Sequence, residues 1–346
     1  MKAYAAAASS KVAQLAAEEA LVDRGTAADA VAAAWFALAG ERSDVFAAPF
    51  VALVAGPSAV GRVFDGRVLQ AGQGGTKPRG LRDDESIPLA SHAASPRALG
   101  AALLLVGSFG SRGLTKAIQC GARTAKASGS TERARLFSRV LAAGAATLPS
   151  FEEEILSVVG RTHGGYITPE DLAAQAGQST ARVRELTHGQ SKVVVCEEAP
   201  EEIGEGALAR RGLGSETESV VAVDHHGTLA AATFFVGFAA HEGRTLEVPS
   251  LGIAWPLGGV PPRHSESRIK PGTPVEVGRT LLAVDAGSAA RMSVAFAVEG
   301  HRPDLDLEGE EDLTAWVRSL GANARVSVLA TSNGASGRLA SASPHG

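Results

Sequence analysis

The first segment of the chain carries apolar side chains at helical spacing. These residues share one face of a predicted helix, and they are Val12, Leu15, Ala16 and Leu21. Ser9 and Ser10 precede this pattern, where a hydroxyl can cap a helix, and Gly25 follows it, where glycine commonly ends one. Thr26 predicts the start of a second helix, because Asp29 stands three residues later in a weak capping-box pattern.

Alanine and leucine dominate residues 95–160, and their spacing predicts mostly helix. The run Thr168-Pro-Glu-Asp171 is typical of a helix start, with a capping threonine, a proline at the first helical position and an acid at the third. Helix capping alone explains this run, so it is not taken as a site. Further helices are expected near 288–298 and 310–320.

Apolar runs and alternating patterns predict the strands. Residues 45–54 and 60–70 fit a hairpin around Gly56-Pro57-Ser58. The other strands are expected at 192–197, 219–224, 228–236, 280–285 and 324–330. Residues 198–213 predict an exposed linker, and residues 331–346 a loop or frayed tail. This order of elements fits an α+β layered fold.

The segment from Gly214 to Thr233 carries the candidate chemistry. Thr217 opens an apolar strand, a polar turn containing Gly227 follows, and the return strand carries Thr233. A threonine hydroxyl inside a chain is a weak nucleophile. Cleavage of the preceding bond, Glu216–Thr217, would create an α-amine that can act as its general base at neutral pH. An ordinary surface hairpin explains the same pattern without chemistry.

These residues resemble the γ-glutamyltransferase family, a branch of the N-terminal-nucleophile (Ntn) hydrolases. In that family the nucleophilic threonine opens a strand of the form Thr-Thr-His-x-Ser-Val-Val-Asp, followed by a glycine turn and Ala-Val-Ser-x-Thr. The matching positions here are Thr217, Asp224, Gly227 and Thr233. Three further segments match family motifs in the same order along the chain, and they are Arg24–Ala34, Phe64–Arg67 and Gly164–Ala173.

The resemblance implies a fold and a division of the chain. It implies the family's four-layer αββα sandwich, in which two central sheets lie between helical layers. Residues 1–216 would form a large-subunit-like segment, and residues 217–346 a small-subunit-like segment that begins at the nucleophile. Together the two segments would make one domain.

The resemblance also implies roles for individual residues. Thr217 would be the nucleophile, and Thr233 would hydrogen-bond to it. Arg67 would bind a substrate carboxylate, to which a guanidinium can form two parallel bonds; an exposed strand-end arginine is the alternative. Ser267 survives from the family's serine pair. Ser288 and Ala289 replace the glycine pair whose backbone N–H groups stabilise the oxyanion, so that donor site is expected to be weaker.

Several positions depart from the family pattern. Glu218 and Ser219 replace the family's second threonine and its histidine, and Phe235 replaces a polar residue that helps to bind the substrate's α-amine. Residues 256–260 contain no carboxylate, although the acid that pairs with that amine should fall there. The expected substrate is a γ-glutamyl-like or related carboxylated acyl amide. Because a buried ammonium group without a partner is heavily disfavoured, a carboxylated acyl donor without a free α-amine, or an otherwise altered substrate, is favoured.

Composition and charge limit the classes of partner and compartment that are expected. The chain has 346 residues, 45% of them hydrophobic, and a formal net charge of −4, which gives no reason to expect nucleic acid or an anionic membrane as a partner. Residues 1–11 lack the apolar core of a signal peptide, which favours a cytoplasmic protein. Cys120 and Cys196 have no metal-binding spacing and are interpreted as inert thiols, with a bridge between them left open. No cofactor is expected.

Three functions compete at this level. The first is a self-cleaving amide hydrolase or transpeptidase that uses a small-molecule acyl donor and passes the acyl group to water or an amine; a homodimer is compatible with it. The second is an inactive, uncut homologue that serves as a scaffold or binding protein. The third, less favoured, is a metal hydrolase using His225, His226 and His241, although adjacent turn residues suit a shared metal poorly.

Overall fold

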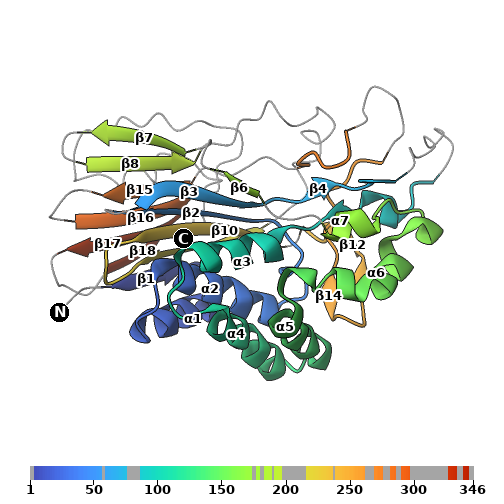
Figure 1. Ribbon diagram of the computed structural model, residues 1–346, viewed down its shortest axis with the longest axis horizontal. Coiled ribbons are helices and arrows are strands. Elements are labelled where there is room, and N and C mark those ends of the chain that lie inside the picture. Colours follow the sequence, from blue (N-terminus) through green and yellow to red (C-terminus); the bar gives the residue numbers. More distant parts are fainter. Residues whose placement is uncertain are drawn as a thin grey trace.

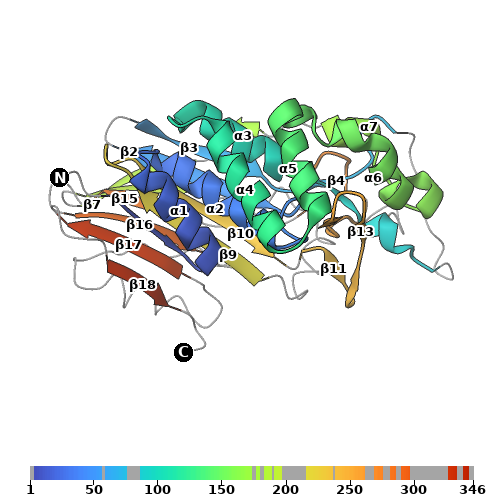
Figure 2. The same ribbon diagram turned by 90° about the horizontal axis from the view of Figure 1, so that it is seen from below.

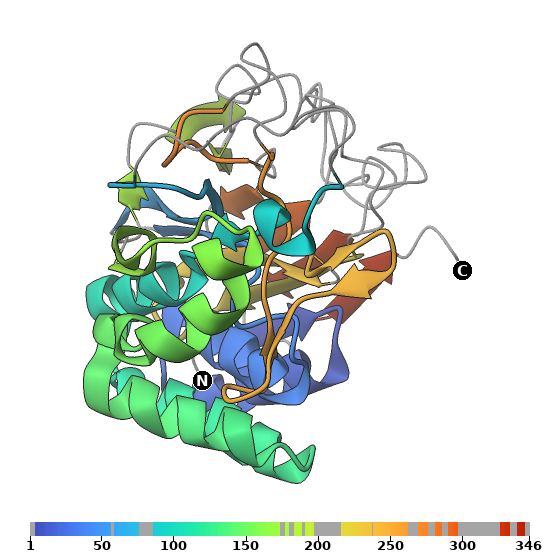
Figure 3. The same cartoon turned by 90° about the vertical axis from the view of Figure 1, so that its right-hand side faces the viewer.

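Two six-stranded antiparallel sheets lie face to face, and helices cover the outer face of the first sheet (Figure 1). This arrangement comes from a computed structural model, which describes residues 4–56, 59–75, 86–173, 177–179, 183–188, 191–196, 216–236, 238–261, 269–275, 281–285, 290–296, 326–332 and 338–342. Figures 2 and 3 show the same layers from below and from the side. The α+β class predicted from the sequence is confirmed.

The first sheet has the strand order β1-β9-β10-β2-β3-β6. Its strands are β1 (Ala5–Ala8), β2 (Phe50–Gly56), β3 (Ala59–Gly66), β6 (Gly177–Ser179), β9 (Glu216–Val223) and β10 (Leu229–Val236). The hairpin β9–β10 therefore lies between β1 and β2, although it follows both of them in the sequence by more than 150 residues. The centre of this sheet combines early and late parts of the chain.

The second sheet has the order β18-β17-β16-β15-β8-β7. Its strands are β7 (Val183–His188), β8 (Ser191–Cys196), β15 (Leu281–Asp285), β16 (Ala290–Phe296), β17 (Val326–Ser332) and β18 (Arg338–Ala342). Strands β15, β16 and β17 contact β2, β9 and β10 across the space between the sheets. The first sheet lines this space with a buried apolar cluster that includes Val51, Leu53, Val221 and Ala231.

The helices are α1 (Lys11–Val22), α2 (Ala27–Glu41), α3 (Ala98–Phe109), α4 (Leu114–Ala127), α5 (Thr131–Ala143), α6 (Glu152–Val159) and α7 (Pro169–Ala173). Helix α2 is buried from Ala27 to Gly40 because it lies between the first sheet on one side and α1 and α4 on the other. Its many alanines allow this close approach on two sides. Trp35 fills the remaining space against Phe46 and Phe50.

The helix starts predicted from the sequence differ in their capping hydrogen bonds. Thr26 caps α2 in a reciprocal capping box, because its hydroxyl accepts the Asp29 N–H and the Asp29 carboxylate accepts the Thr26 N–H. Ser10 occupies the cap position of α1 but makes no side-chain capping bond. Thr168 and Asp171 form a second reciprocal pair at the start of α7.

Two predictions about the last third of the chain are wrong. Residues 290–296 form strand β16 rather than part of a helix. The alternation of Ala290, Met292, Val294 and Phe296 with more polar neighbours gave a two-residue period, and pairing with β15 and β17 satisfies the backbone. The tail predicted from residue 331 onwards contains the end of β17 and the whole of β18.

The first predicted hairpin is shorter than expected. Residues 45–49 form turns before β2 begins at Phe50, and β3 ends at Gly66 before the short strands β4 (Leu69–Gln70) and β5 (Ala94–Ser95) pair with each other. The linker at 198–213 and the helix near 310–320 lie outside the described residues. In the part of the chain that the structure covers, no helix is long and apolar enough to cross a lipid bilayer.

Candidate active site

The β9–β10 hairpin is held by Asp224 at its turn. One carboxylate oxygen of Asp224 accepts the backbone N–H groups of His226 at 2.8 Å and Thr228 at 3.0 Å, and the other accepts the Ala27 N–H at 3.1 Å. Gly227 has a φ of +81°, a conformation that favours glycine. Asp224 thus joins the turn to the first residue of α2, which accounts for an acid at this place without catalysis.

The strand register shows which residues of the hairpin lie opposite one another. Thr217 pairs with Phe235, and Thr233 pairs with Ser219. Because directly paired residues share a face and side chains alternate along a strand, positions 217, 219 and 233 belong to the same face. Thr217 and Thr233 are diagonal neighbours, a relation that corresponds to a separation of about 7–8 Å. The hairpin therefore brings the two predicted threonines onto one face.

This shared face is directed at the second sheet. Thr233 pairs with Val51 on β2, and Val51 belongs to the apolar cluster between the sheets. Val51 pairs in turn with Asp65 on β3, so a single row across the sheet runs from Ser219 through Thr233 to Asp65. The helices pack on the opposite face, against residues such as Ala232 and Phe234.

Thr233 and Ser219 keep polar atoms in this apolar space. Thr233 has no exposed surface and Ser219 has 1%. The Thr233 Oγ1 and the Ser219 Oγ have no hydrogen-bond partner among the described residues. Buried hydroxyls are normally hydrogen-bonded, because leaving one unpaired costs about 1–3 kcal/mol. Two unpaired buried hydroxyls side by side are typical of a binding site, where a bound molecule supplies the missing hydrogen bonds.

Ser9 fixes the backbone next to Thr217. The Ser9 hydroxyl accepts the Ser219 N–H at 2.8 Å and also contacts the Glu218 carboxylate, while the Ser9 N–H donates to the Ser219 carbonyl at 3.0 Å. Ser9 was not among the predicted site residues. About 210 residues separate it from Ser219, and no local pattern relates the two.

Arg67 lies in the interior, so the alternative of an exposed strand-end arginine is wrong. Its side chain is 1% exposed, and its Nε and Nη2 atoms bind both oxygens of Asp65, the closest contact being 2.8 Å. Burial by itself would raise the pKa of Asp65, but the hydrogen bonds and charge of Arg67 hold it below its ordinary value, with help from the charge of Arg97. The sequence pattern did not indicate Asp65 as the partner of Arg67, although Asp65 stands two residues before Arg67 in the same motif.

Helix α3 explains the glycine between these two residues. A side chain at Gly66 would approach the Phe50 carbonyl oxygen to 2.7 Å and the Ala101 Cβ to 2.9 Å. The bare backbone lets the first turn of α3 rest against β3. Arg97, at the start of that helix, is thereby placed close enough for its charge to act on Asp65 and Arg67.

Residues 256–260 border the Arg67 segment. The Gln70 side chain binds both the N–H and the carbonyl of Val260, and the Pro256 carbonyl accepts the Ala94 N–H. Leu257 is buried, and the segment carries no carboxylate. This segment therefore has no acid that could pair with a substrate α-amine. The backbone of the segment is hydrogen-bonded to the strand that follows Arg67.

The structure describes only some of the remaining predicted site residues. Glu216 is the first residue of β9 and pairs with Val236, so the predicted scissile bond joins the first two residues of the strand. Ser267, Ser288 and Ala289 lie outside the described residues, so their predicted roles stay predictions.

The three histidines considered for a metal site do not gather. His225 and His226 occupy the β9–β10 turn, whereas His241 lies beyond the opposite end of β10. The eight residues of that strand span about 26 Å at the usual rise. His225 contacts the Leu21 carbonyl oxygen, and His241 stacks on His92 with ring centroids 4.0 Å apart. Within the described ranges, no group of three potential metal ligands was found.

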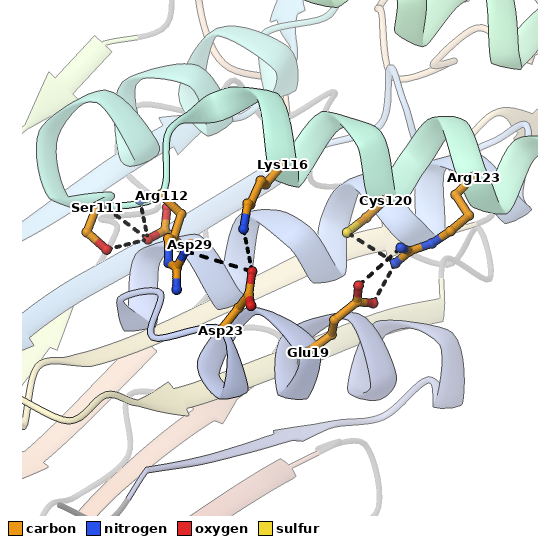
Figure 4. A network of polar contacts seen from close by, with 8 residues as sticks. All are labelled: Glu19, Asp23, Asp29, Ser111, Arg112, Lys116, Cys120 and Arg123. Atoms are coloured by element: carbon orange, nitrogen blue, oxygen red, sulfur yellow. Dashed lines mark hydrogen bonds and ion pairs between the residues drawn. The ribbon is translucent and has the colours of Figure 1, made fainter.

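A pocket on the outer side of the helical layer, about 180 Å³ in volume, is a separate feature (Figure 4). Its charged groups pair with one another, Lys116 with Asp23 and Arg123 with Glu19. Cys120 also lines it as a free, buried thiol, and burial raises the pKa of that thiol. The paired charges join α1 to α4, and the raised pKa agrees with an inert thiol.

Several solved structures are similar to this fold. No model of a known protein family and no curated protein matches the sequence. Among solved structures, LmbA2991HD covers 99% of this chain and 97% of its own, with a TM-score of 0.66 and 14% identity. Cephalosporin acylase from Bacillus halodurans covers 98% and 96%, with a TM-score of 0.65 and 14% identity. A γ-glutamyltranspeptidase from Pseudomonas nitroreducens, complexed with L-DON, covers 60% and 75%, with a TM-score of 0.46 and 18% identity.

The sandwich of two sheets with a threonine hairpin at its centre is thus the fold of the Ntn hydrolases. The likeness to the acylase extends over almost the full length of both chains. At 14% identity, this likeness shows that the two proteins share a fold.

Proposed function

We propose that this protein is a self-processing amide hydrolase or acyltransferase with Thr217 as its nucleophile. The observation that carries the proposal is the register of the β9–β10 hairpin. It puts Thr217 on the same face as the buried Thr233, whose hydroxyl has no partner among the described residues. The acylase-like fold supports the same reaction class.

The proposed chemistry begins with cleavage of the Glu216–Thr217 bond, which frees the Thr217 α-amine. That amine removes the hydroxyl proton while Oγ bonds to the carbonyl carbon of an amide, whose π electrons move to oxygen. Collapse of the intermediate breaks the C–N bond, and the amine leaves with the proton. Water or a second amine then attacks the ester, releases the acyl group and returns a proton to Oγ.

The acyl donor in this proposal carries a carboxylate and has no free α-amine. Asp65 binds the Nε and Nη2 atoms of Arg67 and so orients the guanidinium that would bind the substrate carboxylate. Residues 256–260 offer no acid to a substrate ammonium group. A glutaryl amide therefore fits this site better than a γ-glutamyl amide, which differs by that ammonium group.

Self-cleavage is tested by incubating the purified protein at neutral pH, followed by denaturing electrophoresis and intact mass analysis. We expect two fragments, the smaller beginning at Thr217, and a single uncut chain for Thr217→Ala. A wild-type chain that stays intact would instead support the inactive, uncut homologue. Thr228→Ala is the matched control, because it removes a threonine hydroxyl from the same hairpin at the turn and should leave cleavage unchanged.

Donor selectivity is tested with two chromogenic probes, glutaryl 4-nitroanilide and γ-glutamyl 4-nitroanilide. We expect kcat/KM to be at least about tenfold higher for the glutaryl probe, since an unpaired ammonium group in a buried site costs more than 1.4 kcal/mol. Equal values would contradict the proposed selectivity. Cleavage of neither probe by a protein that has cut itself would move the search to other acyl groups.

A further inference from the structure

The hydrogen-bond donor of the Ser219 hydroxyl has no acceptor among the residues that the structure describes. The Ser219 N–H and carbonyl both bond to Ser9, whereas the Oγ is buried and has no partner among the described residues. Since these backbone groups point toward β1, Ser219 and Thr233 form a non-hydrogen-bonded pair across β9 and β10. Such pairs bring side chains closest, with Cα atoms about 4.5 Å apart.

This hydroxyl lies close to the position of the proposed nucleophile. Ser219 is two residues beyond Thr217 on the same strand and the same face, a separation of about 7 Å along the strand. In the proposed reaction the attacked carbonyl carbon becomes bonded to the Thr217 Oγ. Its oxygen would then lie within reach of the Ser219 hydroxyl, in surroundings otherwise lined by apolar residues such as Val221 and Val51.

A donor in such surroundings can stabilise developing negative charge. Hydrogen-bond donors that are held in place and shielded from water are most effective when aimed at the oxygen that becomes negative in the transition state. Ser9 holds the Ser219 backbone on both its N–H and its carbonyl, so the direction of this side chain is set before any substrate binds.

We propose that the Ser219 hydroxyl is a catalytic donor to the oxygen of the carbonyl that Thr217 attacks. As Thr217 Oγ bonds to that carbon, the π electrons move to oxygen, and Ser219 donates a hydrogen bond to the oxyanion without transferring its proton. The C–N bond then breaks as the C=O bond re-forms. This inference rests on the proposed function, and it assigns to Ser219 part of the stabilisation expected from the region of Ser288 and Ala289.

The kinetic test uses self-cleavage, which needs no added substrate. The rate at which fragments appear is measured for wild type, Ser219→Ala and Ser219→Thr. We expect the alanine variant to be slowed about hundredfold to thousandfold, as for loss of one oxyanion donor. The threonine variant, which keeps the hydroxyl, should stay within a few-fold of wild type. If the glutaryl probe is turned over, kcat should fall with KM unchanged.

The stability test uses the uncut chain and is independent of catalysis. Ser219→Ala is made in a Thr217→Ala background, with Ser95→Ala as the control. Ser95 is equally buried, but its hydroxyl donates to the Asp171 carbonyl at 2.8 Å. We expect Tm to fall for Ser95→Ala and to stay unchanged or rise for Ser219→Ala, because an unpaired buried hydroxyl is removed.

The outcomes separate the inference from the proposed function. Wild-type cleavage with an unaffected Ser219→Ala variant would overturn the role of Ser219 alone. A fall in Tm as large as that of Ser95→Ala would also overturn it, since the hydroxyl would then serve the fold. A wild-type chain that never cuts itself would remove the proposed function and this role together.

Discussion

Buried polar residues in this protein fall into two groups. The carboxylates of Asp65, Asp171 and Asp224 are each bound by several donors and hold backbone segments in place. The hydroxyls of Thr233 and Ser219 are equally buried and have no hydrogen-bond partner in the part of the chain that the structure describes. Residues that do not serve the stability of the fold are commonly those that serve a site. This contrast, more than any single motif, supports the proposal of a site on the inter-sheet face.

The Asp65–Arg67 pair predicts a pH dependence of stability. Arg67 lowers the pKa of Asp65 in the folded state, so the pair stabilises the protein above the unfolded-state pKa of about 3.9 and this contribution is lost as pH falls through the folded-state pKa. Asp65→Asn should cost about 3 kcal/mol at neutral pH, because it removes the charge that faces a buried guanidinium. Urea unfolding of both proteins from pH 7 to pH 2 would measure the difference.

The difference between wild type and Asp65→Asn should shrink below about pH 4. A difference that stays constant across this range would show that the carboxylate charge is not the stabilising element. Asp23→Asn is a useful control, because that acid is exposed in its pair with Lys116 and should contribute little at any pH.

Much of the site was visible in the sequence for reasons that are local. The turn glycine, the Thr26 cap and the strand pairing that relates Thr217 to Thr233 act within about twenty residues, and each is confirmed in the structure. Ser9 and Asp65 were missed as partners. Ser9 acts on a strand more than 200 residues away, which no local period can indicate.

At the level of single elements, the reliability of a local pattern depended on what the element packs against. Helix α2 and the hairpin β9–β10 formed where their patterns predicted them. Strands β16 and β18 did not, because their alanine-rich or polar sequences become strands through pairing with β15 and β17. Pairing partners that come from distant sequence override weak propensity.

The two N-terminal helices provide an internal comparison of capping. Thr26→Ala should destabilise the protein by about 1 kcal/mol, because its hydroxyl accepts the Asp29 N–H at the start of α2. Ser10→Ala should change stability by much less, because Ser10 makes no capping bond at the start of α1. Chemical unfolding of the two variants measures both values, and equal losses would contradict the assignment of the cap.

For the whole molecule, the important feature is that the first sheet is built from both sides of position 217. Strands β9 and β10 are enclosed by β1 and β2, and both share the apolar cluster with β3. The predicted segments 1–216 and 217–346 therefore meet through a continuous backbone ladder as well as through side chains. Such an interface resembles the core of a single domain.

We expect the two fragments to stay together after self-cleavage. They should elute as one species in size-exclusion chromatography under native conditions and separate only in denaturant. The reason is that separation would expose the open edges of β1 and β2 together with the core of the sheet. Spontaneous dissociation at micromolar concentration would show that the ladder across position 217 is weaker than the strand pairing implies.

The insertion of β9 and β10 between β1 and β2 also constrains how the chain is made. When β1 and β2 leave the ribosome, the strands that will join them have not yet been synthesised, so both present open edges for the time needed to add more than 150 residues. Sheets closed by such distant partners fold slowly and are exposed to aggregation meanwhile. Synthesis of this protein should therefore depend on chaperones that hold the nascent chain, and the proposed self-cleavage would begin only once the late hairpin has entered the sheet.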